Sequence, residues 1–184
     1  MEGPDADSLP AGLAAGDMRA FAALYDRFGE RLYRTALSML GRPEDAEDTV
    51  QEVFVAVLKA RLRSKHNKDL TAYLFTVLRH AAARCAARRA RGPELSETAV
   101  QEAVSADQHK NYEDSYGDRL RHALLKLPVE QREVVSLKIG GELTFAEIAE
   151  VLGVNANTAA SRYRYALEKL RVWLGGRRNR NDCR

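Results

Sequence analysis

Five acidic side chains lie between residues 44 and 52, and their spacing places several of them on one side of a helix. Asp45, Asp48 and Glu52 recur at intervals of three and four residues. Clustered carboxylates can bind Mg²⁺ in nucleic-acid enzymes, although no histidine accompanies these and helix-face carboxylates alone make poor two-metal sites. Acids in a first helical turn also balance the helix dipole, which explains Glu44 and Asp45 well but Glu52 poorly.

The chain becomes strongly basic directly after these acids. From Lys59 to Arg91, ten Lys and Arg side chains accompany a single acid, Asp69, which gives a net charge of +9 over 33 residues. Basic side chains at this density suit a polyanion such as the phosphate backbone of a nucleic acid. A solvated helix face is the alternative, but so large a charge is hard to explain on structural grounds alone.

The most specific pattern lies between residues 144 and 171. Thr144 and Glu147 have the spacing of a capping box. Gly153 suits a left-handed turn, and Asn155 can cap a second helix that runs to about residue 174. The outer face of that helix would carry Asn157, Thr158, Ser161, Arg162, Arg164 and Tyr165. We interpret the pattern as a DNA-binding helix-turn-helix; an ordinary helical hairpin with a solvated basic face is the alternative.

Composition limits the class of protein that carries these patterns. The 184 residues are 45% hydrophobic and 7% aromatic, which argues against wholesale disorder. Cys85 and Cys183 are too few for a disulfide scaffold or a cysteine-rich zinc site, and Cys85, among alanines, is expected to pack as a small residue. The longest apolar run, 53–58, is far shorter than a membrane span. We therefore expect a cytoplasmic protein without membrane insertion.

The formal net charge of +3 conceals an uneven distribution. Residues 1–92 carry a net charge of +3, residues 93–118 carry −6, and residues 119–184 carry +6. Two basic segments on either side of an acidic connector indicate two domains and a polyanionic partner.

Apolar residues recur at helical spacing on both sides of this connector, and no strand pattern competes. The helical segments are expected at about 21–40, 43–58, 70–91, 120–127, 129–139, 144–152 and 155–174. Their apolar faces are predicted to include Tyr25, Leu58 and Ile139. The predicted fold class is all-α, with two small helical domains joined by a flexible acidic linker.

Both halves resemble bacterial RNA polymerase sigma factors of the extracytoplasmic-function (ECF) group, within the sigma-70 family. The second half is similar to region 4 of that family, in Leu127-Pro-Val-Glu-Gln-Arg-Glu-Val-Val135 and Leu143-Thr-Phe-Ala-Glu-Ile-Ala-Glu-Val-Leu-Gly153. The first half is similar to region 2, in Phe21-Ala-Ala-Leu-Tyr25, Ala46-Glu-Asp-Thr-Val-Gln-Glu-Val-Phe54 and Leu70-Thr-Ala-Tyr-Leu-Phe75. The resemblance implies an N-terminal tail (1–15), region 2 (16–92), a linker (93–118), a region 4 helix-turn-helix (119–175) and a basic tail (176–184).

The resemblance also assigns partners. It implies that the helix with the acidic cluster docks on the clamp coiled coil of the polymerase β′ subunit, and that region 4 binds the β flap. The docking residues would be Asp45, Glu47, Asp48, Gln51, Glu52 and Phe54. An anti-sigma factor that holds the protein inactive is a further partner that the resemblance implies.

Promoter DNA would be bound at two places. The melted non-template strand of the minus-ten element would contact Arg61, Arg63, Lys65, His66, Asn67, Lys68, His80, Arg84, Arg88 and Arg89. The double-stranded minus-thirty-five element would contact Thr144, Asn157, Thr158, Ser161, Arg162 and Arg164. The chain departs from the common family pattern at Arg84, where an Asp is usual, and at Ala160, where a Lys is frequent.

The expected function is therefore promoter-specific transcription initiation, without catalytic residues, metal or cofactor. A second hypothesis, which Arg84 motivates, is a sigma-like DNA-binding regulator that has lost promoter melting. A third is a nucleic-acid enzyme that uses Asp45, Asp48 and Glu52 with Mg²⁺.

Overall fold

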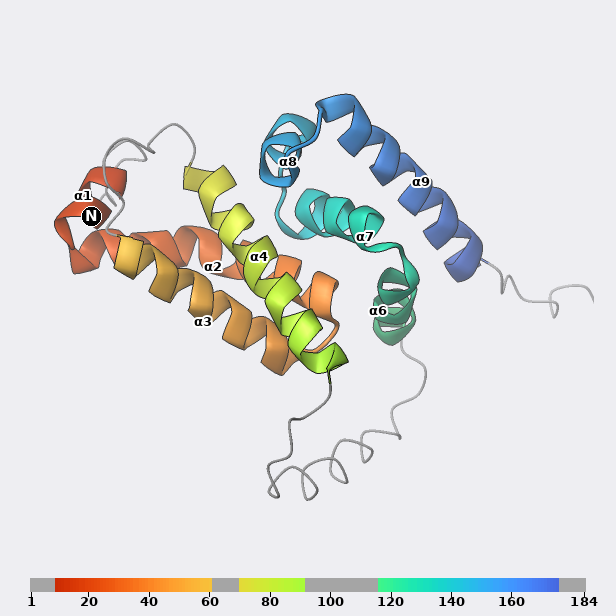
Figure 1. The fold of residues 1–184 in the computed structure, drawn as a ribbon, viewed down its shortest axis with the longest axis horizontal. Helices are drawn as coiled ribbons and strands as arrows, with labels where there is room; N and C mark the ends of the chain where they lie inside the picture. The colour runs from red at the N-terminus through yellow and green to blue at the C-terminus, as the bar shows by residue number, and fades with distance from the viewer. Residues whose placement is uncertain (1–8, 61–69, 92–115, 176–184) are drawn as a thin grey trace, which may run out of the picture.

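A computed structural model describes residues 9–60, 70–91 and 116–175 of the chain (Figure 1). The first group of helices consists of α1 (Leu9–Ala15), α2 (Met18–Leu40), α3 (Pro43–Ala60) and α4 (Leu70–Ala90). The second consists of α6 (Tyr116–Lys126), α7 (Val129–Val135), the π-helix η2 (Ser136–Gly140), α8 (Phe145–Leu152) and α9 (Ala156–Gly175). Every regular element in these ranges is helical, which confirms the predicted fold class. Most of the predicted linker and the whole C-terminal tail lie outside the described residues.

The helix boundaries follow from local chemistry. The Asp17 carboxylate accepts a hydrogen bond of 2.8 Å from the backbone N–H of Arg19 at the start of α2. Gly41 ends α2 in the left-handed conformation, with φ of 79°, and its N–H donates to the Leu37 carbonyl oxygen. Pro43 is the first residue of α3, where its missing N–H costs no helical hydrogen bond.

The helical part begins earlier than the sequence suggested. Leu9 and Leu13 of α1 are buried, and α1 packs against α2. Residues 9–15 were predicted to belong to a tail, because an apolar pattern of only two turns does not stand out in a sequence.

The main core lies among α2, α3 and α4, and it continues into the second group of helices. Leu24, Leu32, Val53 and Phe75 are inaccessible to solvent. The same continuous cluster contains buried side chains from beyond the linker: Val134, Leu137, Leu143, Ile148, Val151 and Ala159. A smaller cluster holds α6, α7 and α9 together through Ala123, Leu127, Val135, Ala166 and Leu170. The two predicted helical groups are thus present, and they share buried surface that the sequence patterns did not predict.

Three residues predicted to lie on apolar faces are instead exposed: Tyr25 by 57%, Leu58 by 51% and Ile139 by 58%. Ile139 lies in η2, where the wider π-helical turn breaks the α-helical register on which the prediction rested. Leu58 lies in the last turn of α3, and Tyr25 lies at the edge of the α2 stripe.

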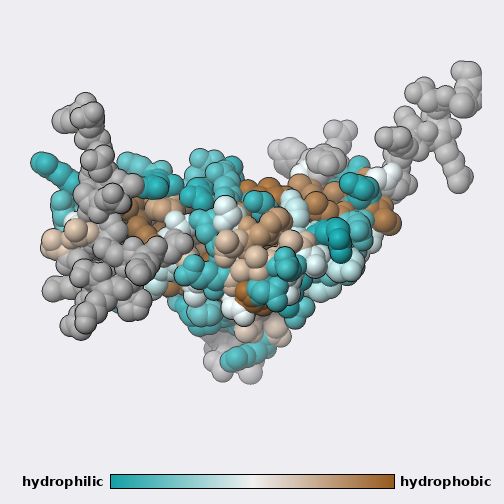
Figure 2. Space-filling view, turned by 90° about the horizontal axis from the view of Figure 1, so that it is seen from above, coloured by the Kyte–Doolittle hydropathy of each residue, from teal (hydrophilic) through white to brown (hydrophobic). Residues whose placement is uncertain are grey.

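The surface seen from above is mostly hydrophilic, with hydrophobic patches toward the end of the molecule where α9 finishes (Figure 2). Val172 is 71% exposed and Trp173 is 42% exposed in this last part of α9. Among the described residues, no helix has the length and apolar character needed to cross a bilayer.

Candidate functional site

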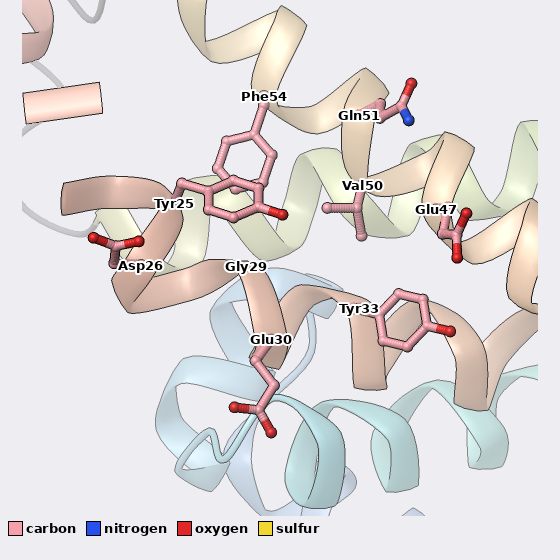
Figure 3. Close-up of a pocket in the computed structure, with 9 residues that line it drawn as sticks. All are labelled: Tyr25, Asp26, Gly29, Glu30, Tyr33, Glu47, Val50, Gln51 and Phe54. Atoms are coloured by element: carbon pink, nitrogen blue, oxygen red, sulfur yellow. The ribbon is translucent and has the colours of Figure 1, made fainter. Parts of the chain in front are cut away.

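A groove of about 660 Å³ runs between α2 and α3 (Figure 3). Its lining comes from Tyr25, Asp26, Gly29, Glu30 and Tyr33 of α2 and from Glu47, Val50, Gln51 and Phe54 of α3. The groove therefore lies on the side of α3 that carries three of the predicted polymerase-docking residues, Glu47, Gln51 and Phe54.

Aromatic rings form one end of this groove. The Phe54 ring is buried, lies 5.1 Å from the Tyr25 ring and meets the Phe21 ring edge-on at 5.8 Å. The Tyr25 ring itself is more than half exposed. Gly29 is buried beneath this ring, and a Cβ there would be in ordinary van der Waals contact with the Tyr25 ring, at 3.7 Å. An apolar side chain from a partner can therefore contact ring surface here.

Acidic groups surround the same rings. The carboxylates of Asp26, Glu30 and Glu47 line the groove, and Figure 3 shows them around Tyr25 and Tyr33. All three residues are exposed. Aromatic faces beside carboxylates bind a Lys or Arg side chain, since both attract a cation and the rings cover its apolar stem.

The structure divides the predicted polymerase-docking residues into two sets. Glu47 and Gln51 line the groove and Asp48 is exposed beside them, whereas Phe54 lies at the base of the groove. Asp45 and Glu52 lie on the side of α3 that faces α4. The Glu52 carboxylate is 2.6 Å from Arg84, and the Asp45 carboxylate is 3.0 Å from Arg89.

Those two ion pairs also involve residues of the predicted minus-ten surface. His80, Arg84, Arg88 and Arg89 are all exposed on α4. Arg84 and Arg89 are nevertheless held by carboxylates of α3, so part of the basic charge on this face is already balanced. The six other predicted minus-ten residues, between Arg61 and Lys68, lie outside the described residues.

Cys85 lies beneath this face and is 4% exposed, which confirms that it packs as a small residue. Burial raises the pKa of its thiol, and the nearby Asp45 carboxylate raises that pKa further. The Arg88 guanidinium lies 3.8 Å from the Cys85 sulfur, but its lowering effect on the pKa is smaller than that of burial.

The predicted helix-turn-helix is present in α8 and α9. The Thr144 hydroxyl accepts a hydrogen bond of 3.2 Å from the Glu147 N–H, and the Glu147 carboxylate accepts one of 2.6 Å from the Thr144 N–H. The Thr144 hydroxyl also donates a hydrogen bond of 2.7 Å to the Glu147 carboxylate. This bond and the bond from the Thr144 amide hold the pKa of Glu147 below its usual value. Gly153 takes the left-handed turn with φ of 66°, and the Asn155 side chain accepts a bond of 2.7 Å from the Thr158 N–H. The capping box, the turn and the second cap are thus confirmed.

The outer face of α9 forms a shallow polar hollow of about 410 Å³. Its lining consists of Asn155, Asn157, Thr158, Ser161, Arg162 and Tyr165. Arg164 lies beside it, with its guanidinium 5.2 Å from the centre of the Tyr165 ring. The predicted minus-thirty-five residues of α9 are therefore together on one face, whereas Thr144 is at the start of α8 with its hydroxyl and amide bonded to Glu147. Such a face can enter the major groove and offer amide, hydroxyl and guanidinium groups to base edges.

The groove also contains residues that were not predicted to belong to a site. Tyr25, Asp26, Glu30 and Tyr33 of α2 share the groove with the predicted α3 residues. Asp26, Glu30 and Tyr33 recur at four and three residues beside the apolar stripe of α2, which was the available signal. In the part of the chain that the structure describes, no group of three or more His, Cys, Asp or Glu side chains could hold a metal ion.

Comparison with known proteins agrees with both halves of this geometry. Residues 24–92 match the family model for sigma-70 region 2, and residues 117–170 match the model for sigma-70 region 4. The ECF RNA polymerase sigma factor SigK of Mycolicibacterium vanbaalenii is 30% identical over 177 residues, which cover 92% of this chain and 89% of SigK. The chain belongs to the ECF group of sigma-70 family sigma factors.

Other relatives of this sigma factor also match over most of the chain. The ECF sigma factor RpoE of Cereibacter sphaeroides is 29% identical over 157 residues, covering 84% of this chain and 86% of that protein. The structure of CnrH in complex with the cytosolic domain of CnrY superposes with a TM-score of 0.69 at 26% identity, covering 92% of this chain and 97% of CnrH. RpoE of Bartonella quintana, solved with the anti-sigma factor NepR, has a TM-score of 0.65 at 22% identity over 88% of this chain and 100% of that one, and it shares the fold.

Proposed function

We propose that this sigma factor binds core RNA polymerase and directs initiation at promoters whose two elements its two halves contact. The observation that carries the proposal is the presence, in one chain of this family, of an acidic and aromatic groove on α2 and α3 together with a helix-turn-helix whose polar face lines a shallow hollow. The first surface suits a basic protein partner, and the second suits duplex DNA. On this view the protein acts through binding rather than through an active site of its own.

The groove between α2 and α3 is the proposed docking site for the β′ clamp coiled coil. Glu47, Asp48 and Gln51 would contact the clamp from α3, while Tyr25 and Asp26 would contact it from α2. Their exposure supports this role, because none of them is needed to fill the core. Asp45 and Glu52 would contribute less directly, since they hold Arg89 and Arg84 in place.

Region 4, proposed to extend over 119–175, would read the minus-thirty-five element with Asn157, Thr158, Ser161, Arg162 and Arg164 and would also bind the β flap. Region 2, proposed to extend over 16–92, would hold the melted minus-ten strand with the exposed basic residues of α4 and with the basic residues between 61 and 68. Residues 93–118 would link the two. Binding of an anti-sigma factor in the cytoplasm is the proposed control. Two structures support it: RpoE of Bartonella quintana was solved with the anti-sigma factor NepR, and CnrH was solved with the cytosolic domain of CnrY.

Run-off transcription with core polymerase on genomic fragments tests this function. We expect transcripts that depend on the sigma factor, and sequencing of their starts will show the shared upstream elements. Alanine at Arg162 should remove most of these transcripts, whereas alanine at the exposed Val172 of the same helix should leave them. Failure to obtain any dependent transcript would contradict the proposal.

The second candidate, a DNA-binding regulator that does not melt promoters, rests on Arg84. Its guanidinium is paired with Glu52 where relatives commonly carry an acid, so the charge beside the proposed minus-ten strand differs from the usual one. If this candidate holds, the protein will shift promoter DNA without polymerase and will not bind the β′ clamp fragment.

A further inference from the structure

The outer side of α9 carries two arginines, Arg162 and Arg164, that point in different directions. Residues two apart in an α-helix lie about 160° apart around its axis, because each residue turns the helix by about 100°. Arg162 is half-buried and lines the polar hollow, whereas Arg164 is exposed and lies outside the hollow. The two guanidinium groups are therefore placed for different contacts with one duplex.

The width of the major groove indicates which contact each arginine can make. An α-helix with its side chains is about 10–12 Å wide, and the major groove of B-form DNA is about 12 Å wide, so a helix fills the groove. Side chains in the middle of the inserted face then meet base edges, and those at its sides meet the phosphates of the groove walls. Thr158 and Ser161 lie near the middle of the hollow, and Arg164 lies beyond its edge. Arg164 is thus placed for a phosphate rather than for a base.

A tyrosine ring holds the Arg164 side chain at this edge. The Arg164 guanidinium lies over the Tyr165 ring, 5.2 Å from its centre, which is within the range of a cation–π contact. Tyr165 is 50% exposed and lines the hollow, so its ring connects the hollow with the arginine beside it. The ring attracts the positive charge but accepts no strong hydrogen bond, and the N–H donors of Arg164 remain available for phosphate oxygens.

Charged neighbours mark where the proposed DNA face of α9 ends. Within the described ranges of the chain, Arg164 has no ion-pair partner, whereas carboxylates hold Arg84 and Arg89 of α4. One turn beyond Arg164, Glu168 is exposed on the same side of α9 and would repel a phosphate backbone. Arg164 and Tyr165 therefore lie in the last turn of α9 that can approach a DNA strand closely.

We propose that Arg164 and Tyr165 form a backbone anchor, in which Arg164 donates to a phosphate of the minus-thirty-five duplex and Tyr165 is the positioning residue that holds the guanidinium in place. The side chains of the hollow, with Arg162 among them, then read base edges, while the anchor fixes the register of α9 in the groove. Tyr165 acts through its ring and not through its hydroxyl. The inference rests on the proposed function, because it concerns the same duplex.

The first test uses holoenzyme reconstituted with the full-length sigma factor and a promoter fragment found by run-off transcription. Arg164→Gln should weaken binding about fivefold, and by the same factor on fragments with single base changes in the minus-thirty-five element, because a phosphate contact carries no sequence information. The slope of log K against log[KCl] should become smaller by about 0.9, as expected for the loss of one phosphate contact. Arg171→Gln is the matched control, because it removes an exposed charge from the same side of α9 two turns further along, and it should change neither quantity. Arg162→Ala should instead change which base is preferred.

An uncharged methylphosphonate placed at successive positions of the duplex locates the contact. At the contacted phosphate it should weaken binding of wild-type holoenzyme and leave binding of Arg164→Gln holoenzyme unchanged.

Substitutions at Tyr165 test the positioning role. Tyr165→Phe keeps the ring and should bind as wild type, whereas Tyr165→Leu should bind about threefold more weakly. Combined with Arg164→Gln, Tyr165→Leu should cause no further loss, because the ring acts through the arginine. Circular dichroism should give all these variants the wild-type thermal midpoint, since both side chains are exposed.

Four results would decide against these assignments. A changed base preference in Arg164→Gln would make Arg164 a base-reading residue and overturn the anchor. Equal losses for Tyr165→Phe and Tyr165→Leu, or a full additional loss in the double variant, would overturn the positioning role of Tyr165. If Arg162→Ala weakens binding and the Arg164 and Tyr165 variants do not, the anchor fails and the proposed function stands. If wild-type holoenzyme forms no promoter complex that depends on the sigma factor, the proposed function fails and the anchor fails with it.

Discussion

At the scale of single residues, the acidic and basic side chains of the first half cannot be assigned separately to polymerase and to DNA. Glu52 and Arg84 bond to each other, as do Asp45 and Arg89, across the face that α3 and α4 share. A substitution on either helix therefore alters the charge that the other presents.

Arg84→Ala tests how much this coupling matters. Both partners are more than half exposed, so the free energy of unfolding should change by less than about 1 kcal/mol in urea titrations. Promoter opening, followed by permanganate reactivity of the minus-ten thymines, should fall clearly, because Arg84 is proposed to contact the melted strand. Glu52→Ala is the matched control, since it breaks the same pair and leaves the arginine in place. Equal opening by wild type and Arg84→Ala would remove Arg84 from the proposed DNA surface.

The capping box at the start of α8 gives a prediction about stability. Thr144→Ala should lower the free energy of unfolding by about 1 kcal/mol, because an N-cap hydroxyl and its hydrogen bond are lost. Urea titration at neutral pH measures this loss.

The same capping box also has a pH dependence. The folded state lowers the pKa of Glu147 from its usual value of 4.5, so its contribution is complete above that value and is lost as the pH falls through the lower folded value. The difference in unfolding free energy between wild type and Glu147→Gln should therefore shrink on acidification below about pH 4.5. A difference that stays constant down to pH 3 would contradict the proposed bonds of the carboxylate.

At the scale of helices, the proposed docking groove combines α3, which the sequence predicted to dock, with α2, which was predicted as a helix but not as part of the docking site. The acidic cluster predicted that one side of α3 is exposed. Aromatic and acidic residues of α2 form the rest of the groove lining. An exposed Tyr25 beside the buried Phe54 is the feature that distinguishes this groove from a merely charged surface.

Tyr25→Ala should weaken binding of the full sigma factor to a β′ clamp fragment by about tenfold, because truncation of an exposed aromatic within an interface removes a large contact. Fluorescence anisotropy with the labelled fragment measures this affinity. Tyr165→Ala is the matched control, because Tyr165 is exposed by 50%, close to the 57% of Tyr25, but lies on α9. If both variants bind the fragment as wild type does, the clamp docks elsewhere.

The sequence was sufficient to predict every described helix except α1, the caps of α8 and α9, and the polar face of α9, because each depends on short-range periodicity and capping. It was not sufficient for the groove, which requires the crossing of two helices, or for Ile139, whose exposure follows from the π-helical turn. The two ion pairs between α3 and α4 were also missed, since Glu52 and Arg84 are 32 residues apart. The basic residues between 61 and 68 remain a prediction.

At the scale of the whole molecule, the two halves share one buried cluster that includes Leu32, Phe75, Leu137 and Ile148. Sequence periodicity cannot reveal such sharing, because a helix buried against its own group and one buried against a distant group have the same apolar stripe. The glycine pair at 140 and 141, which follows the helix predicted over 129–139, permits the backbone to approach Thr35 and Phe75 closely.

This shared cluster predicts that the free protein unfolds in a single thermal transition. In scanning calorimetry the calorimetric and van't Hoff enthalpies should agree for wild type, because neither half keeps its buried surface without the other. Gly140→Ala should separate the transition into two, whereas Gly175→Ala should not. Two well-resolved transitions in wild type would mean that the halves unfold independently.

The contact between Arg31 and Gly141 spans 110 residues of sequence, and this has a consequence for synthesis of the protein in the cell. At about 5–20 residues per second, a ribosome needs roughly 5–20 s to add that length of chain. During that interval residues 136–142 are not yet available to cover the side of α2 that they later meet, nor Phe75 once it has been added. A nascent sigma factor of this kind is therefore expected to need a chaperone most while the segment before residue 136 is being translated.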